Sequence, residues 1–135
     1  MAPPRPLVLL PGALSDARLF AHQATHLADI ADARVVELPD HARVGAMAAA
    51  VLAAAPARFA LAGLSLGAIV ALEIVHRAPA RVERLALLAT SPAPDPPELR
   101  AVRRAAAAKA RAGALEAQLE VVLPLLLAAA DRKSV

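Results

Sequence analysis

The pentapeptide Gly63-Leu64-Ser65-Leu66-Gly67 decides the fold that this sequence predicts. It joins an apolar run at residues 58–64, which is typical of a buried strand, to residues 66–76, which are typical of a buried helix, and Ser65 is the residue between them. A G-x-S-x-G segment in that context predicts a strand-to-helix turn so sharp that its serine is strained. Side chains two residues away would collide with the strand or the helix, and Gly63 and Gly67 have none.

Strands and helices alternate on both sides of this turn. The sequence predicts strands at residues 7–10, 34–38, 58–64 and 82–89, and helices from Ser15 or Asp16 to about Leu27, at 44–55 and at 66–76. One helix between successive strands predicts right-handed crossovers, and hence an α/β fold with a parallel sheet and helices on both faces. The strands are almost continuously apolar, so we expect them to be buried on both faces.

The pattern changes after Ser91. The segment Asp95-Pro-Pro-Glu98 resembles a capping box with proline in the first turn. It predicts a helix to about Ala112, a break at Gly113, and a second helix from Leu115 to Ala130. We therefore expect two parts: residues 1–94 as an α/β half, and residues 95–135 as a helical hairpin.

Composition excludes several classes of protein. The 135 residues include no Cys, so disulfides, thiolate metal sites and a cysteine nucleophile are excluded. The net charge of +3 comes from residues 97–135, but with 1% aromatic residues the chain lacks the stacking platforms of a nucleic-acid surface. Its apolar stretches are too short or too interrupted to span a membrane, and the prolines near the start lead us to expect no signal peptide. We expect a cytoplasmic protein.

A second element strengthens the significance of the serine turn. The first predicted strand ends in Pro11-Gly12, which predicts a tight loop beside Ser65. Acyl-transfer enzymes of this architecture take one oxyanion-binding N–H from such a loop and another from the residue after the nucleophile. Those donors here would be Ala13 and Leu66. The alternatives are an ordinary loop and an ordinary tight turn.

These segments resemble a known family. Residues 7–20, the turn at residues 63–67, and the run from Ala78 to Leu88 look like the amino-terminal half of an α/β-hydrolase fold enzyme. The likeness is closest to small bacterial esterase-like members that begin with Leu-Pro-Gly, and it spans about residues 6–128, ending at the start of a helical cap. It implies a Ser-His-acid hydrolase that acts on a small ester or acyl substrate without a cofactor. By this likeness Ser65 is the nucleophile, and Ala13 and Leu66 form the oxyanion hole.

The chain departs from that family in one respect. There the acid and the histidine follow later strands beyond the cap, and this sequence has no such strands. A serine without a base is a poor nucleophile, so we expect a truncated enzyme with weak or absent turnover. Labelling of Ser65 by an active-serine probe, lost in Ser65→Ala, would overturn that expectation.

None of the four histidines is predicted to replace the missing base. His22 and His26 are spaced like a metal pair but have no third ligand, and His76 suits a helix C-terminus. His41 and Asp95 follow strands at the same sheet edge as Ser65, but we leave both outside the predicted catalytic set. We expect no metal site.

Two other interpretations remain open. The chain could be a non-catalytic α/β binding or interaction protein that keeps the serine turn as scaffold, or a half-hydrolase completed by another chain. An unpaired sheet edge at residues 82–89 also predicts self-association.

Overall fold

A computed structural model of the chain describes residues 4–126. Its elements are β1 (Arg5–Leu10), η1 (Ala17–Phe20), α1 (Ala21–His26), β2 (Ala31–Val35), α2 (Val44–Ala54), β3 (Phe59–Leu64), α3 (Leu66–Arg77), η2 (Pro79–Arg81), β4 (Val82–Leu88), α4 (Pro97–Arg111) and α5 (Leu115–Leu126). They divide into two compact units, Met1–Pro92 and Ala93–Val135, of which the first contains the sheet. No helix among the described residues has both the length and the apolar character needed to cross a bilayer.

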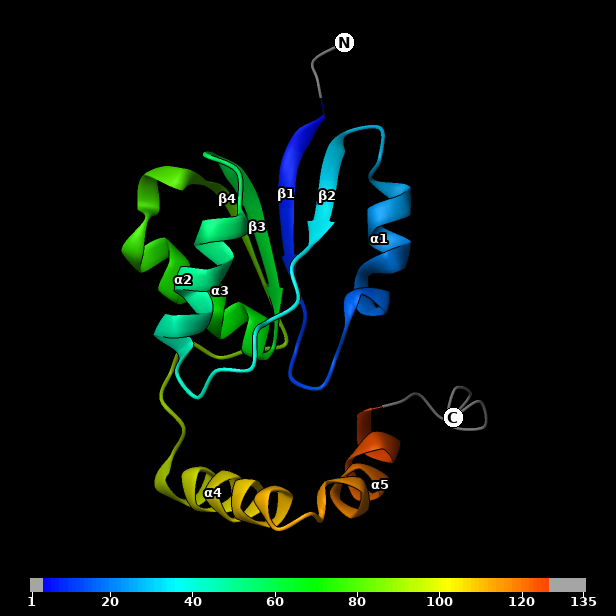
Figure 1. Cartoon of the computed structure of the whole chain (residues 1–135), viewed down its shortest axis with the longest axis vertical. Helices are drawn as coiled ribbons and strands as arrows, with labels where there is room; N and C mark the ends of the chain where they lie inside the picture. The colour runs from blue at the N-terminus through cyan, green and yellow to red at the C-terminus, as the bar shows by residue number, and fades with distance from the viewer. Residues whose placement is uncertain (1–3, 127–135) are drawn as a thin grey trace. The chain divides into compact units, whose positions relative to one another are not determined.

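The four strands form one parallel sheet in the order β2-β1-β3-β4. Figure 1 shows α2 and α3 together on one side of the sheet and α1 on the other. This arrangement confirms the predicted α/β class, with crossover helices on both faces. Because all strands run the same way, their carboxyl ends lie at one edge, where sheets of this kind place their ligands.

Alternating strand residues build a separate core on each face. On the α2–α3 side, Phe59 and Leu61 of β3 are buried against Val51 of α2 and Ile74 of α3. The other face has a smaller cluster, centred on Leu9, Phe20 and Ala62. Ala48 and Ala71 are fully buried as well, so the alanine-rich helices contribute close packing more than large apolar area.

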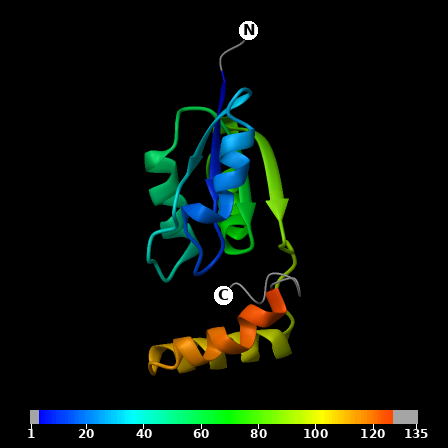
Figure 2. The same cartoon turned by 90° about the vertical axis from the view of Figure 1, so that its right-hand side faces the viewer.

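The outer strand β4 is less covered than the sequence predicts. Leu85, Leu87 and Leu88 are each about two-fifths exposed, at 41%, 38% and 43%. Figure 2, which looks onto the α1 side, shows no helix of this unit in front of β4. The expectation that the strands are buried on both faces is therefore wrong for β4, because no described helix of this unit covers that face of the strand (Figure 2). It is also wrong for β2, the other edge strand, where Asp32 and Arg34 are exposed.

Two other elements differ from the prediction. The first predicted helix is a 3-10 turn followed by the short α1, although Asp16 does cap it by accepting the Arg18 N–H at 2.9 Å. The strand β2 begins three residues earlier than predicted, since its register follows β1: Arg5 pairs with Ala31, and the Arg5 N–H donates to the Ile30 carbonyl at 3.2 Å. Pairing with β1, more than the apolar run at residues 34–38, determines where β2 begins.

The second unit contains the predicted helical hairpin. The capping box is wrong: the N-cap of α4 is Pro96, and Asp95 instead pairs with Arg103, its Oδ2 lying 2.7 Å from Nε. The break at Gly113 is confirmed, since Gly113 has φ +89° and the Ala114 N–H donates to the Lys109 carbonyl, as in a Schellman cap. Residues 127–130 of the predicted second helix lie outside the described residues.

Candidate active site

Ser65 occupies the turn between β3 and α3 in a strained backbone conformation. Its φ of 53° and ψ of −113° lie outside the regions that residues with a side chain normally adopt. The Ser65 N–H donates to the carbonyl of Leu88 at the end of β4 (2.9 Å), and its carbonyl accepts the N–H groups of Ala68 and Ile69. These bonds hold the turn, while the serine itself is exposed at the carboxyl edge of the sheet.

The two glycines allow close approach of the backbone, of β3 to α3 at Gly63 and of α3 to the end of β1 at Gly67. A Cβ on Gly63 would lie 2.5 Å from the Gly67 carbonyl carbon and 2.6 Å from the Ala68 nitrogen. A Cβ on Gly67 would lie 2.6 Å from the Pro11 oxygen and 2.7 Å from the Leu10 carbonyl carbon. These neighbours are backbone atoms that cannot rotate away, so both positions require the absence of a side chain.

The loop after β1 lies beside Ser65. A Cβ built on Gly12 would be 3.5 Å from the Ser65 Cβ, which places this loop in contact distance of the serine. The Ser15 N–H donates to the Gly12 carbonyl at 3.3 Å, which closes a turn around Ala13 and Leu14. Ala13 is exposed within that turn, and Leu14 has a positive φ of 59°.

Backbone strain gathers at this edge of the sheet. Among the described residues, the non-glycine residues with positive φ are Leu14, Ser65 and Ala89, and they follow β1, β3 and β4 respectively. Strained backbone of this kind costs about 1–3 kcal/mol per residue and concentrates at functional sites. Residues with positive φ therefore follow three neighbouring strands, and Ser65 is one of the three.

Free N–H donors are present at the turn. Leu66 is the first residue of α3, where backbone N–H groups have no partner within the helix. Within residues 4–126, neither the Leu66 nor the Ala13 N–H donates a hydrogen bond. The positive end of the α3 dipole also lies here, so the surroundings of Ser65 favour negative charge.

The structure brings none of the predicted alternative residues into hydrogen-bond contact with Ser65. His22 and His26 stack on each other with ring centroids 3.9 Å apart, and His26 Nδ1 bonds to the His22 carbonyl at 2.9 Å. His76 lies at the other end of α3, about 16 Å along the helix from Ser65. His41 is exposed between β2 and α2, where its N–H donates to the Pro39 carbonyl.

No group of three or more metal-ligating side chains converges in the described part of the chain. The titration shift nearest the site belongs to Asp16, beyond the Gly12 loop. Its hydrogen bond from the Arg18 side chain lowers the pKa of Asp16 and raises the pKa of Arg18. This exposed pair fixes the start of η1 and has no contact with Ser65.

Sequence reasoning missed one part of the site. The Leu88 carbonyl, which accepts the Ser65 N–H, is supplied by β4. No side-chain motif could have identified it, because the contact depends on the pairing of β3 with β4 in the register Leu64 to Leu88. The role of the Gly12 loop was expected from Pro11-Gly12, but its closeness to Ser65 comes from the adjacency of β1 and β3.

Comparisons with known proteins bear on the family and the fold of this chain. No curated protein matches the chain. Among solved structures, wild-type Cfl2 from Burkholderia cenocepacia is similar, with a TM-score of 0.61 and 28% sequence identity over 71% of this chain. The match covers 39% of the Cfl2 chain. The Thioesterase domain family matches residues 5–130, nearly the whole sequence. The chain therefore belongs to the thioesterase domain family, whose members are α/β-hydrolase-like acyl hydrolases.

Proposed function

We propose that this chain supplies the nucleophile and the oxyanion hole of a hydrolase for small esters or thioesters. Ser65 is the nucleophile, and the N–H groups of Ala13 and Leu66 bind the oxyanion. The observation that carries the proposal is the strained, exposed Ser65 at φ 53°, held between two glycines that admit no side chain. Such strain has a cost that a mere connecting turn would not need.

The reaction follows from the surroundings of the serine. The Ser65 oxygen attacks the acyl carbon, and the carbonyl oxygen becomes an oxyanion between the two N–H donors. Collapse of this intermediate expels the thiol or alcohol and leaves an acyl-serine, which water then hydrolyses to the free acid and Ser65. Loss of one oxyanion donor typically costs about 2.7–4 kcal/mol of transition-state stabilisation.

The proton of the Ser65 hydroxyl requires a base. Ser65 Oγ makes no hydrogen bond within residues 4–126, and the four histidines of the sequence lie elsewhere. A positioned general base contributes about 10²–10⁴-fold to such reactions. We therefore propose that the 135-residue chain turns over weakly by itself and that its activity depends on a base supplied from outside these residues.

Free imidazole can test both parts of this proposal. The chain contains no Cys, so thiol released from a short-chain acyl thioester can be measured with a disulfide reagent without a protein background. Ser65→Ala removes the nucleophile. Ser15→Ala is the matched control, because it removes an exposed hydroxyl that makes only a long 3.5 Å hydrogen bond to the Ala13 carbonyl and leaves the Ala13 N–H in place. After subtraction of the protein-free reaction of imidazole with the thioester, we expect slow thiol release without imidazole. We expect a rise of about tenfold with imidazole in the wild type and in Ser15→Ala only, because exposed Ser65 is open to a diffusible base.

Each outcome has a defined meaning. Rapid release without imidazole would contradict the weak turnover but leave the role of Ser65 intact. Equal rates in wild type and Ser65→Ala at every imidazole concentration would reject Ser65 as nucleophile. That second result would favour the alternative, a non-catalytic binding protein that keeps the serine turn as scaffold.

A further inference from the structure

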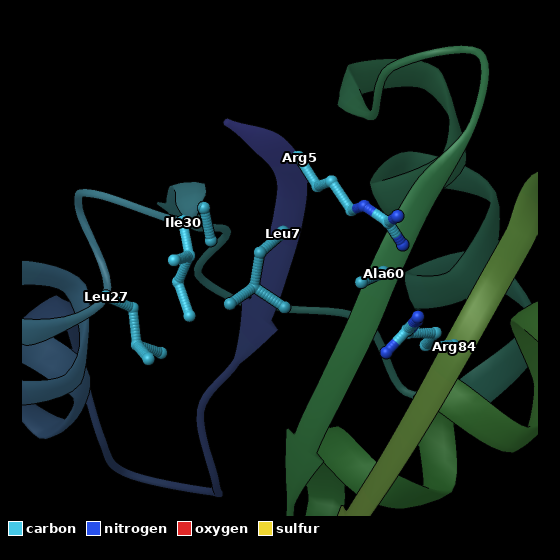
Figure 3. Close-up of a pocket in the computed structure, with 7 residues that line it drawn as sticks. Arg5, Leu7, Leu27, Ile30, Ala60 and Arg84 are labelled. Carbon is cyan, nitrogen blue, oxygen red and sulfur yellow. The ribbon is translucent and has the colours of Figure 1, made fainter. Parts of the chain in front are cut away.

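A hollow of about 300 Å³ opens at the opposite edge of the sheet, on its α1 side. Figure 3 shows Arg5 and Arg84 extending toward Ala60 of β3, with Leu7, Leu27 and Ile30 on the other side. We call it the two-arginine hollow. Its volume is at the lower end of the range for small-molecule sites.

Strand register creates this hollow. Leu7 of β1 pairs with Ala60 of β3, and Ala60 pairs with Arg84 of β4, so the three residues form one row across the sheet. Arg5 precedes Leu7 by two residues and therefore lies on the same face. Ala60 contributes only a methyl group between its larger neighbours, which leaves the floor of the hollow open and apolar.

The segment between α1 and β2 forms the apolar wall. The Leu27 carbonyl accepts the N–H groups of Ile30 and Ala31 at 3.0 and 2.8 Å, which fixes both Leu27 and Ile30 above the sheet. The Arg5 N–H donates to the Ile30 carbonyl and anchors this wall to β1. Ile30 remains 63% exposed, which leaves a large apolar side chain at the rim of the hollow.

The two arginines have no partner within the described residues. Four other arginines of this unit are ion-paired, Arg18 with Asp16, Arg34 with Asp32, Arg58 with Glu83, and Arg77 with Glu73, and Arg81 donates to backbone carbonyls. Arg43 has no ion pair in the described residues either, but it does not line the hollow. No side-chain hydrogen bond or ion pair involves Arg5 or Arg84 in residues 4–126. Two guanidinium groups therefore share one hollow with no neutralising carboxylate. An anion between them would receive charge-assisted hydrogen bonds.

We propose that the two-arginine hollow binds a small anionic amphiphile. A carboxylate or phosphate head lies between Arg5 and Arg84, and a short apolar chain covers Leu7 and Ala60 against the wall of Leu27 and Ile30. Guanidinium groups suit both kinds of head because their planar N–H donors match carboxylate and phosphate oxygens. The apolar floor excludes small hydrophilic anions as the preferred ligands.

This site is separate from Ser65. Ala60 and Ser65 are five residues apart along β3, which corresponds to about 16 Å. Binding at the two-arginine hollow therefore goes beyond the proposed hydrolase function and does not depend on it. A binding measurement can succeed or fail whatever the reactivity of Ser65.

The test is a titration of the full chain with octanoate, octyl phosphate and octanol, each below its micelle concentration. Methyl NMR shifts of Leu7, Leu27 and Ile30 report the position, and calorimetry reports the affinity. Arg5→Gln and Arg84→Gln remove one charge each. Arg43→Gln is the matched control, because Arg43 is also exposed, has no ion pair in the described residues and does not line the hollow.

We expect both anions to shift these methyl groups and octanol to bind much more weakly. Each hollow variant should weaken anion binding about tenfold, while Arg43→Gln leaves it unchanged. The stronger of the two anions identifies the preferred head group. Ala60→Leu should abolish binding because the larger side chain fills the floor of the hollow. If Ala60→Leu does not fold, Arg5→Gln and Arg84→Gln still decide the test.

Three results would overturn the proposal. The first is an equal affinity of the chain for octanol and octanoate. The second is an anion affinity weakened as much by Arg43→Gln as by Arg5→Gln and Arg84→Gln. The third is the absence of methyl NMR shifts at Leu7, Leu27 and Ile30. The second would show that the chain attracts anions through net charge alone. A fourth result would overturn it too: a dependence on Arg5 and Arg84 that appears only in self-association would mean that a second copy, not a small amphiphile, occupies the hollow.

Discussion

Replacing Gly67 with alanine should disrupt the serine turn through a single methyl group. The new Cβ would lie 2.6 Å from the Pro11 oxygen and 2.7 Å from the Leu10 carbonyl carbon, with the Leu10 oxygen also in collision. All three atoms belong to the backbone where β1 ends. Relief of these contacts therefore requires α3 to move away from the loop that carries Gly12 and Ala13.

Two opposing effects determine how much Gly67→Ala changes the free energy of unfolding. Overpacking of this kind costs about 1–3 kcal/mol, and the rigid backbone neighbours place Gly67→Ala at the upper end. Alanine returns at most about 1 kcal/mol through its higher helix propensity, and less in the first turn. We expect a net loss of about 2 kcal/mol in the free energy of unfolding.

Gly45→Ala is the matched control. Gly45 is the second residue of α2, as Gly67 is of α3, but its Cβ would meet the end of the flexible Arg77 side chain. Arg77 can rotate away at the cost of an exposed ion pair with Glu73, which contributes little. Gly45→Ala should therefore be neutral or stabilising by up to about 1 kcal/mol.

Urea unfolding followed by far-UV circular dichroism measures the difference, because the chain has no Trp or Tyr to serve as a fluorescence probe. With a typical m-value of about 2 kcal/mol/M, the midpoint of Gly67→Ala should fall by about 1 M relative to wild type. A midpoint equal to that of Gly45→Ala would refute the claim that β1, β3 and α3 meet too closely at Gly67 for a side chain.

Three further variants test other parts of the structure by the same unfolding measurement. Arg81→Ala should lose about 2–3 kcal/mol, because its guanidinium donates to four backbone carbonyls and lies 5.6 Å from the Phe59 ring centre; a loss below 0.5 kcal/mol would contradict this role. Ser65→Gly should gain about 1 kcal/mol by relieving the positive φ, whereas Ser65→Ala should not; equal stabilities would show that the turn is not strained. The pKa of Asp16 is lowered in the folded state, so its negative charge stabilises the fold at pH values above its ordinary pKa of 3.8. This stabilisation is lost as the pH falls through the pKa of the folded state. Asp16→Asn should therefore have a lower Tm than wild type at neutral pH and a similar Tm in strong acid.

The serine turn was predictable because its determinants are local. Gly63, Ser65 and Gly67 lie within five consecutive residues, and the apolar runs on both sides identify the strand and the helix. The start of β2 was not predictable from its own residues, because its pairing with β1 sets its register. The apolar sequence of β4 indicates a strand but cannot show whether anything covers it.

The two-arginine hollow and the base of the active site illustrate a different limit. Arg5 and Arg84 are 79 positions apart in the sequence, and they come together because each lies on the same face of a strand next to β3. A count of charges, which balances over residues 1–96, conceals that pairing. The sequence suggests no catalytic place for any of its histidines, and within residues 4–126 the structure brings none of them into hydrogen-bond contact with Ser65.

The central claim is that Ser65 is the reactive nucleophile of this chain. Its most direct test is incubation with a fluorophosphonate in the presence of imidazole, followed by intact mass measurement and peptide mapping. The account predicts one adduct, on the peptide that contains Ser65, which forms readily with imidazole and only slowly without it, is lost in Ser65→Ala and is retained in Ser15→Ala. No adduct, or an adduct spread equally over Ser15 and other exposed serines, would contradict it.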